Sequence, residues 1–293
     1  MSRLLRLRSV ESNRQRLDGG AMFGHVPRAL WAKWHAPDAR GTIDLACRCL
    51  LAEYEGGRRV LFETGPGACF PEALRERYAI EAGGHRLLRE LEGFGVLPET
   101  IDDIVLSHLH FDHAGGLLAP FDKDAPPALA FPQARIWVSR PAWERAQHPH
   151  RRDRASFLPS LQALLQHSPL LRIVETPGPM FEGVTSAWSE GHTPGLMLAR
   201  IETSAAEGAP AFRFASDLIP GTAWVHAPVT MGYDRFPECL VDEKQAYLDD
   251  AMACGDLLVF THDPEVAVAG LARGDSGNIQ AHGAADHLVW QAA

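Results

Sequence analysis

The chain has 293 residues, of which 46% are hydrophobic, so it can bury a sizeable core, and α/β folds often use this length as a single domain. Its formal net charge of -9 at pH 7 argues against a nucleic-acid-binding surface. We therefore expect one domain over residues 1–293 and no nucleic-acid partner.

The cysteines and the first residues bear on the cellular compartment. Five cysteines form no C-x-x-C pair and are odd in number, which favours free thiols in a reducing cytosol. Residues 1–8 alternate arginine with leucine and contain no continuous apolar stretch, so we expect neither a signal peptide nor a membrane span. The sequence predicts a cytoplasmic protein with no membrane partner.

Short apolar runs predict the elements of the first hundred residues. Alternation over residues 3–10 indicates a half-buried strand. The runs 45–54 and 58–62, joined by Gly56-Gly57, predict a β-hairpin. Apolar residues at helical intervals predict an amphipathic helix over 84–94.

The segment 17–34 is rich in glycine and large apolar side chains. We expect it to form a flap whose Met22, Phe23 and Trp31 supply an apolar wall to a substrate pocket. A loop packed on the core is an equal alternative, and the same apolar surface could instead form a homodimer interface.

Four polar residues crowd the end of the apolar run Ile104-Val105-Leu106, which predicts a buried strand. These are His108, His110, Asp112 and His113. Buried imidazoles and carboxylates need partners, so this pattern indicates metal ligands more than packing. One short turning loop could serve two ions.

The second half alternates further strands and helices. A strand over 134–138 should lead into a short helix capped by Ser139, with Pro141 in its first turn. The remaining predictions are helices over 157–165, over 242–253 and just after Pro264, and strands over 170–174, 196–201, 212–215 and 257–261. Strands with intervening helices fit a layered α/β protein.

Later donors are needed to complete two metal sites. His192 lies in a Gly- and Pro-bounded loop before a strand, whereas Asp217 and His262 follow apolar strands. Each of them lies next to a strand end, where a layered fold can bring loops together.

The motif His108-X-His110-X-Asp112-His113 after an apolar strand resembles the metallo-β-lactamase superfamily. Further segments resemble its quorum-quenching-lactonase-like (YtnP-like) branch: 17–24, 191–193, 216–220, 231–234 and 261–263. The resemblance implies an αβ/βα four-layer sandwich with metals at one edge of the two sheets.

The resemblance also implies a ligand set. His108, His110 and His192 would hold one divalent ion, Asp112, His113 and His262 a second, and Asp217 would bridge them. Nitrogen and oxygen donors suit zinc, which we favour, but also iron, manganese or cobalt. Relatives usually carry aspartate where Glu63 stands, near the metal site.

The predicted activity is a metal-dependent hydrolase, in which a hydroxide shared by two metals opens a lactone or ester, such as an N-acyl homoserine lactone. Asp112 is the candidate catalytic proton shuttle. Trp224 and Tyr233 would bind substrate opposite the flap. Relatives place a tyrosine three residues after the bridging aspartate, where this chain has Pro220, so Tyr233 could take over that role. The alternatives are a phosphotriesterase-type hydrolase and a mononuclear-iron sulfur dioxygenase.

Overall fold

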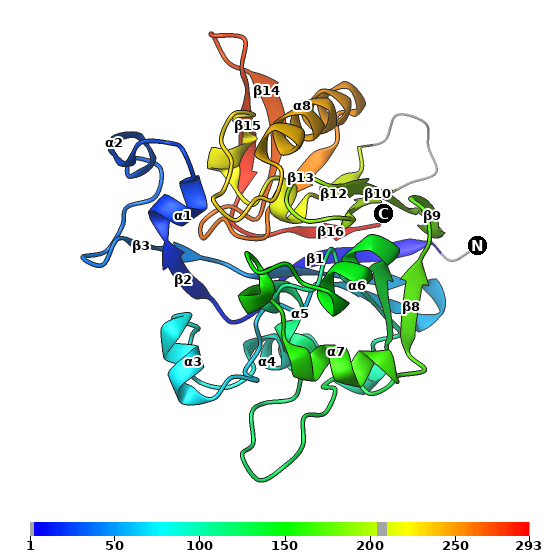
Figure 1. Cartoon of the computed structure of the whole chain (residues 1–293). Helices are drawn as coiled ribbons and strands as arrows, with labels where there is room; N and C mark the ends of the chain where they lie inside the picture. The colour runs from blue at the N-terminus through cyan, green and yellow to red at the C-terminus, as the bar shows by residue number, and fades with distance from the viewer. Residues whose placement is uncertain (1–2, 204–209, 293) are drawn as a thin grey trace.

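Two seven-stranded sheets packed face to face form the centre of the computed structural model (Figure 1). The structure describes residues 3–203 and 210–292. The domain expected over 1–293 therefore includes residues 1–2, 204–209 and 293, which lie outside the described residues.

The first sheet is built by the first half of the chain and one C-terminal strand. Its order is β16 (Val289–Gln291), β1 (Leu4–Glu11), β4 (Arg48–Tyr54), β5 (Arg59–Phe62), β6 (Asp103–Val105), β7 (Arg135–Ser139) and β8 (Leu171–Val174). Strands β5 to β8 pair in parallel, while β4 and β5 form the predicted antiparallel hairpin. The sequence-based prediction of this hairpin is confirmed.

The second sheet is built by the second half of the chain. Its order is β15 (Ile279–Ala285), β14 (Val268–Arg273), β13 (Leu257–Val259), β12 (Phe212–Phe214), β11 (Leu196–Ile201), β10 (Val184–Ser189) and β9 (Gly178–Phe181). The short helix expected after Pro264 is wrong, because the chain there leads directly into β14. The hydrogen bonds of residues 265 and 266 to the Asp263 carboxylate form a turn instead.

Helices cover the outer face of each sheet (Figure 1). The first sheet is covered by α4 (Arg86–Gly93), α6 (Arg140–Gln147) and α7 (Pro159–Gln166), and the second by α8 (Pro237–Cys254). Ser139 caps α6 as predicted, since its Oγ accepts the Ala142 N–H at 3.2 Å. Helix α8 begins five residues earlier than the predicted 242–253, with Pro237 in its first turn.

The inner faces of the two sheets share one hydrophobic core. Phe62 and Val105 of the first sheet pack with Met197, Phe214 and Val259 of the second, all almost fully buried. Helix, sheet, sheet and helix therefore form four layers, which confirms the predicted αβ/βα sandwich. Among the described residues, no helix combines the length and apolar character needed to cross a membrane.

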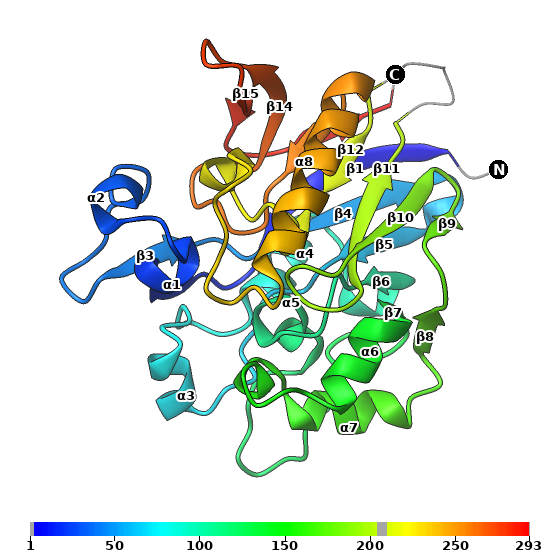
Figure 2. The ribbon, with the colours of Figure 1, turned by 45° about the horizontal axis from the view of Figure 1, so that its top comes forward.

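The segment 17–34 folds beside the sandwich rather than as a plain loop. A two-stranded ribbon of β2 (Gln15–Asp18) and β3 (Thr42–Leu45) carries α1 (Gly19–Phe23) and α2 (Arg28–Trp31), which project to one side in Figure 2. A side chain at Gly19 would lie 2.5 Å from the Trp31 ring, so the tight packing of this segment requires glycine there. Helix α3 (Glu72–Arg77) lies on the same side of the molecule in Figure 2, and Tyr78 follows it directly in the sequence.

Candidate metal centre

The candidate ligands gather where strands of both sheets end. His108 and His110 follow β6, and Asp112 and His113 lie on the single-turn helix α5 (Phe111–Ala114). From the second sheet come His192 before β11, Asp217 after β12 and His262 after β13. The sandwich thus brings together all seven residues, which are up to 154 positions apart in the printed sequence.

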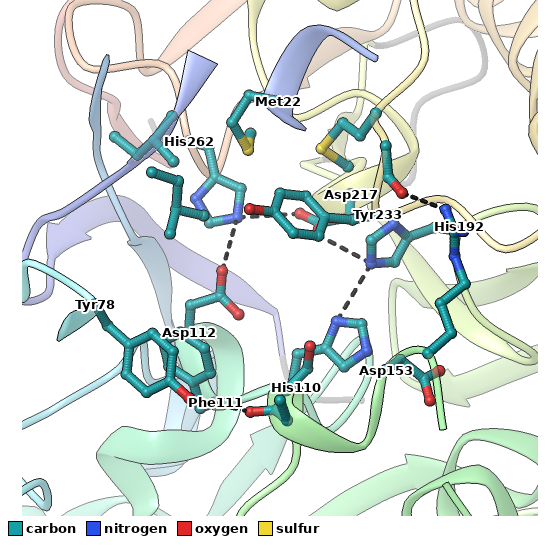
Figure 3. Close-up of a pocket in the computed structure, with 17 residues that line it drawn as sticks. Met22, Tyr78, His110, Phe111, Asp112, Asp153, His192, Asp217, Tyr233 and His262 are labelled. Carbon is teal, nitrogen blue, oxygen red and sulfur yellow. Dashed lines mark hydrogen bonds and ion pairs between the residues drawn. The ribbon is translucent and has the colours of Figure 1, made fainter. Parts of the chain in front are cut away.

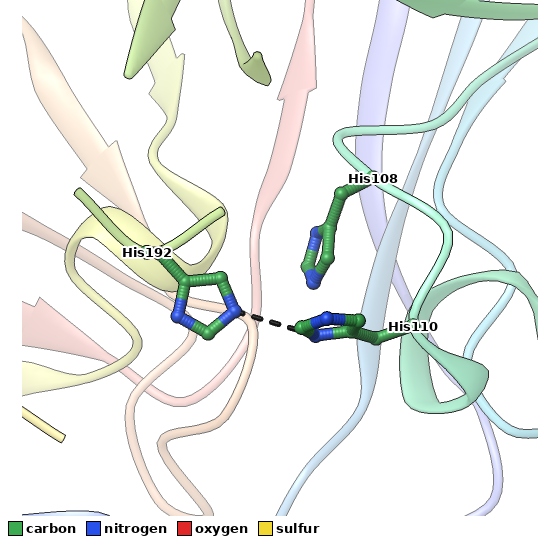
Figure 4. Close-up of side chains that lie close together, drawn as sticks. All are labelled: His108, His110 and His192. Atoms are coloured by element: carbon green, nitrogen blue, oxygen red, sulfur yellow. Dashed lines mark hydrogen bonds between the residues drawn. The ribbon is translucent and has the colours of Figure 1, made fainter. Parts of the chain in front are cut away.

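The donor atoms form three overlapping groups, and within each group they lie within 4.8 Å of one another. His108, His110 and His192 make the first group (Figure 4), Asp112, His113 and His262 the second, and the third, of His108, His113 and Asp217, links these two. The first two groups are the ligand sets expected from the sequence. Their positions fit a dinuclear metal centre, and their role as ligands stays a prediction.

Asp217 lies between the two groups. Its Oδ2 is 3.2 Å from Nε2 of His192, in the first group. Its Oδ1 is 3.3 Å from Nε2 of His113 and 3.1 Å from Nε2 of His262, both in the second group. Because each oxygen faces a different group, the carboxylate has the geometry of a bridging ligand.

Unpartnered ring nitrogens show that the donor set fits a metal. Nε2 of His108 and of His110 is buried without a hydrogen-bond partner in the described residues. The other nitrogen of His108 is 2.8 Å from the Ser107 hydroxyl, and Nδ1 of His262 donates to the Ala46 carbonyl at 2.7 Å. The carbonyl bond fixes the proton of His262 on Nδ1, and both bonds use Nδ1, so that Nε2 is the nitrogen available to a metal, as is typical of metal-bound histidine.

Burial and carboxylates shift the histidine pKa values in opposite directions. Burial, together with the neighbouring imidazoles, lowers the pKa of His110 to about 3 and that of His108 well below its usual value. Burial also acts to lower the pKa values of His113 and His262, but Asp217, together with Asp112 and Glu63 at His113 and with Cys47 at His262, outweighs burial and raises both pKa values. The centre is therefore electrostatically suited to positive charge beside Asp217.

The two candidate carboxylate ligands remain ionised. Burial would raise the pKa of Asp217, but His113, His262 and His192 outweigh it and hold that pKa well below its usual range. The pKa of Asp112 is lowered in the same way, by His113 and His262 against burial. A buried carboxylate and a largely buried one in the same centre favour a bound cation as their counter-charge.

Glu63 supports the second group from behind. It is 1% exposed, and its Oε1 accepts the Ser107 N–H at 2.8 Å. Its Oε2 lies 3.4 Å from Nδ1 of His113. Glu63 also has a positive φ of 66°, a strained conformation for a residue with a side chain. The Glu63 side chain therefore holds the ligand loop at two points, the Ser107 backbone and the His113 ring.

Two supporting residues were not found from the sequence. Gln15 donates its Nε2 to Oδ2 of Asp112 at 2.8 Å, and Asp234 accepts from Nδ1 of His192 at 2.9 Å. Asp234 lies in the segment 231–234 that was singled out for its resemblance, but no spacing linked it to His192. Gln15 has no local signal, because it is 97 residues from its partner.

A cavity of about 430 Å³ opens directly onto the metal centre (Figure 3). Met22 and Tyr233 line it, as expected. The other aliphatic and aromatic residues of the wall are Leu17, Leu45, Met231, Tyr78 and Phe111. Tyr78 and Phe111, whose ring centroids are 4.5 Å apart, were not predicted, nor was Arg152, which also lines the cavity.

The other three aromatic residues expected at the pocket lie elsewhere. Phe23, Trp31 and Trp224 are 0–3% exposed and do not line the cavity. The Phe23 ring stacks between Trp224, at 4.4 Å, and Trp31, at 5.6 Å. The expectation of a substrate role is corrected for these three, because stacking on one another buries their apolar area inside the protein.

Tyr233 keeps its phenol proton. Burial, with the nearby Asp112 charge, raises the pKa of Tyr233 to about 12. The hydroxyl is therefore a hydrogen-bond donor at neutral pH, on a side chain that faces the cavity in Figure 3.

A two-sheet sandwich with two His- and Asp-rich ligand groups at its edge defines the class of this protein as a metallo-β-lactamase-like fold with a dinuclear-type site. Residues 42–205 match the Metallo-beta-lactamase superfamily, and the chain belongs to this superfamily.

Curated relatives of the chain include lactonases. Over 170 residues it is 32% identical to an N-acyl homoserine lactonase of a Bacillus species and 31% identical to the N-acyl homoserine lactonase AiiA of Bacillus thuringiensis subsp. kurstaki. Each match covers 55% of this chain and only 60% of the relative's length.

Solved structures share the fold over nearly the whole chain. A crystal structure of a "probable metal-dependent hydrolase from Staphylococcus aureus" superposes with a TM-score of 0.82 at 23% identity, covering 96% of this chain and 97% of that one. AidC, a dizinc quorum-quenching lactonase in complex with the product N-hexanoyl-L-homoserine, superposes with a TM-score of 0.73 at 20% identity and the same coverage. At these identities the likeness shows the fold alone.

Proposed function

We propose that this protein is a metal-dependent hydrolase that opens a lactone or another carboxylic ester, with N-acyl homoserine lactones as the candidate substrates. The observation that carries the proposal is the bridging geometry of Asp217 between two ligand groups that open onto one largely apolar cavity. The lactonase relatives support the substrate class, as does the resemblance to the YtnP-like branch.

The residues present fit two divalent ions, for which zinc is the favoured metal. One ion would be held by His108, His110 and His192, the other by Asp112, His113 and His262, with Asp217 shared between them. Ions bound there would lower the pKa of water to about 7 and polarise the substrate carbonyl.

Asp112 is suited to carry a proton. Gln15 holds its Oδ2, and the side chain faces the cavity with 14% of its surface exposed. The carboxylate is ionised at neutral pH, so it would be free to accept the proton that the attacking water loses as its oxygen bonds to the carbonyl carbon. It would then pass this proton to the alkoxide that leaves as the ester opens.

Tyr233 is suited to orient the substrate. Its protonated phenol can donate a hydrogen bond to an oxygen of the ester. Pro220 occupies the position three residues after Asp217, so this chain has no phenol there. Tyr233, in the loop before α8, lines the cavity at the metal centre and could supply the phenol instead.

Phosphotriester hydrolysis is the nearest second candidate, since the same centre could direct attack on phosphorus. Sulfur oxidation at a single iron is less favoured, because the second ligand group is complete in this chain. The lactone proposal ranks first because of the apolar cavity walls, which suit an acyl chain.

The test combines metal content with turnover. Protein purified without added metal is analysed for elements per chain, then assayed on an N-acyl homoserine lactone and an organophosphate triester. We expect two metals and faster lactone opening; faster triester cleavage would favour the second candidate, and one iron with neither activity would overturn the proposal. Asp217→Asn should reduce metal content and turnover together, and full activity in this variant would refute the bridging role.

A further inference from the structure

Asp234 connects a candidate metal ligand to the wall of the cavity. It is 2% exposed, and its Oδ1 is 2.9 Å from Nδ1 of His192. Its Oδ2 accepts the Met231 N–H at 2.6 Å. Because a carboxylate accepts hydrogen bonds, Asp234 favours a proton on Nδ1 of His192, and this leaves Nε2 as the nitrogen that can bind a metal.

The backbone beside Asp234 holds the same histidine. The Arg235 N–H donates to the His192 carbonyl at 3.1 Å, and the Phe236 N–H donates to the Gly191 carbonyl at 2.8 Å. The main chain and the ring of His192 are therefore both positioned by residues 234–236.

The other half of the turn, Met231 to Tyr233, forms the cavity wall. It is anchored at Gly232, whose N–H donates to the Ala21 carbonyl of α1 at 2.7 Å and whose carbonyl accepts from Arg152. Lys244 of α8, fully buried, donates to the Val229 carbonyl at the start of the same turn. Few conformations of this turn satisfy all of these bonds.

We propose that Asp234 is a positioning residue with two linked roles. One carboxylate oxygen sets the tautomer and orientation of His192 for the first metal, and the other holds the wall against which the substrate binds. The inference rests on the metal centre of the proposed function. It goes further by making metal affinity and substrate affinity depend on one buried carboxylate.

Asparagine at this position is an informative change. Both partners of Asp234, the His192 ring and the Met231 N–H, are donors, whereas an amide offers one acceptor and one donor. If the amide oxygen stays on Met231, its NH₂ group faces Nδ1 and favours a proton on Nε2, the nitrogen that would bind the metal. Loss of such a supporting partner typically weakens metal binding about 10–100-fold.

A matched control separates this role from general stability. Asp256 is also buried, at 1% exposed, and accepts from Arg200 and Arg213 at 2.8 and 2.6 Å within the second sheet. It contacts none of the candidate ligands. Asp256→Asn should therefore destabilise the protein without changing zinc binding.

The experiment is a zinc titration of the full chain against a chromophoric chelator, with cobalt absorption spectra and KM for a lactone at saturating zinc. For Asp234→Asn we expect one site weakened about 10–100-fold, the other within twofold of wild type, an altered cobalt spectrum and a KM raised several-fold. Asp256→Asn should keep the wild-type values.

Three results would overturn the inference. If Asp234→Asn binds zinc as tightly as the wild type and gives the same cobalt spectrum, the role of Asp234 is purely structural. Should that variant not fold, ¹⁵N spectra of the wild-type histidines decide, since a neutral His192 ring whose single proton is on Nε2 contradicts the assigned tautomer. No zinc binding by the wild type would refute the proposed metal centre itself, which is a distinct outcome.

Discussion

Arg48 joins the two sheets behind His262, and its replacement by methionine should strongly destabilise the protein. Its guanidinium is 1% exposed and donates to the carbonyls of Phe260, at 2.7 Å, Asp263, at 3.1 Å, and Val266, at 3.2 Å. Its Nε donates to the Glu11 carboxylate at 2.8 Å. The Arg48 side chain thus adds to the backbone bonds that attach the loop of His262 beside β4, the Arg48 N–H to the Thr261 carbonyl at 2.9 Å and the Ala46 N–H to the His262 carbonyl at 3.2 Å.

The expected loss of stability follows from the hydrogen-bond acceptors that would lose their donor. Arg48→Met keeps much of the packing but leaves three carbonyl groups and one carboxylate without this donor. A buried unsatisfied acceptor costs about 1–3 kcal/mol, and Glu11, with 23% of its side chain exposed, can recover water. We expect the free energy of unfolding to fall by about 3–5 kcal/mol, the range observed when one partner of a buried ion pair is removed. For a chain of this size, such a loss lowers Tm by roughly 10 °C.

Urea unfolding followed by circular dichroism, on protein treated with a chelator, measures this loss. Arg14→Gln is the matched control, since Arg14 donates to the Pro264 carbonyl at 3.2 Å and lies 3.7 Å from Glu11. Its side chain is 42% exposed, so its removal should cost under about 1 kcal/mol. If Arg48→Met and Arg14→Gln destabilise equally, the reasoning is refuted.

Three further predictions follow from other sites. Burial lowers the pKa of Lys244 to about 8 in the folded protein, so between pH 8 and 10.5 the unfolded chain binds more protons than the folded one. The free energy of unfolding of the wild type, relative to that of Lys244→Met, should therefore rise over this pH range by up to about 3 kcal/mol, as measured by urea unfolding. A difference between the two proteins that does not change with pH would contradict this. Tyr233→Phe should lower kcat/KM for a lactone about 10–100-fold at unchanged metal content, and full turnover would exclude the proposed hydrogen bond. Trp31→Ala should cost about 3–5 kcal/mol in unfolding yet keep the wild-type KM, because the ring does not line the cavity; a raised KM at unchanged stability would restore the flap interpretation.

Local patterns in the sequence predicted many elements and the candidate ligands. The Ser139 cap with Pro141 in the first turn of α6 is an interaction within three residues, so it can be recognised without a fold. The strand-end position of His108 and its neighbours was recognised for the same reason. Strands such as β10 and β15 were not predicted, because serine, threonine, glycine and histidine interrupt their apolar pattern.

Only the tertiary structure determines which distant segments of the chain come into contact. Asp234 and Gln15 support the candidate ligands His192 and Asp112 from 42 and 97 residues away, and nothing in their local sequence indicates these partners. Phe23 and Trp224 illustrate the opposite case, since composition marks both as suitable for a pocket. Which apolar side chains line the cavity and which stack in the core depends on how the two sheets and the segment beside them pack, and that packing is a property of the whole chain.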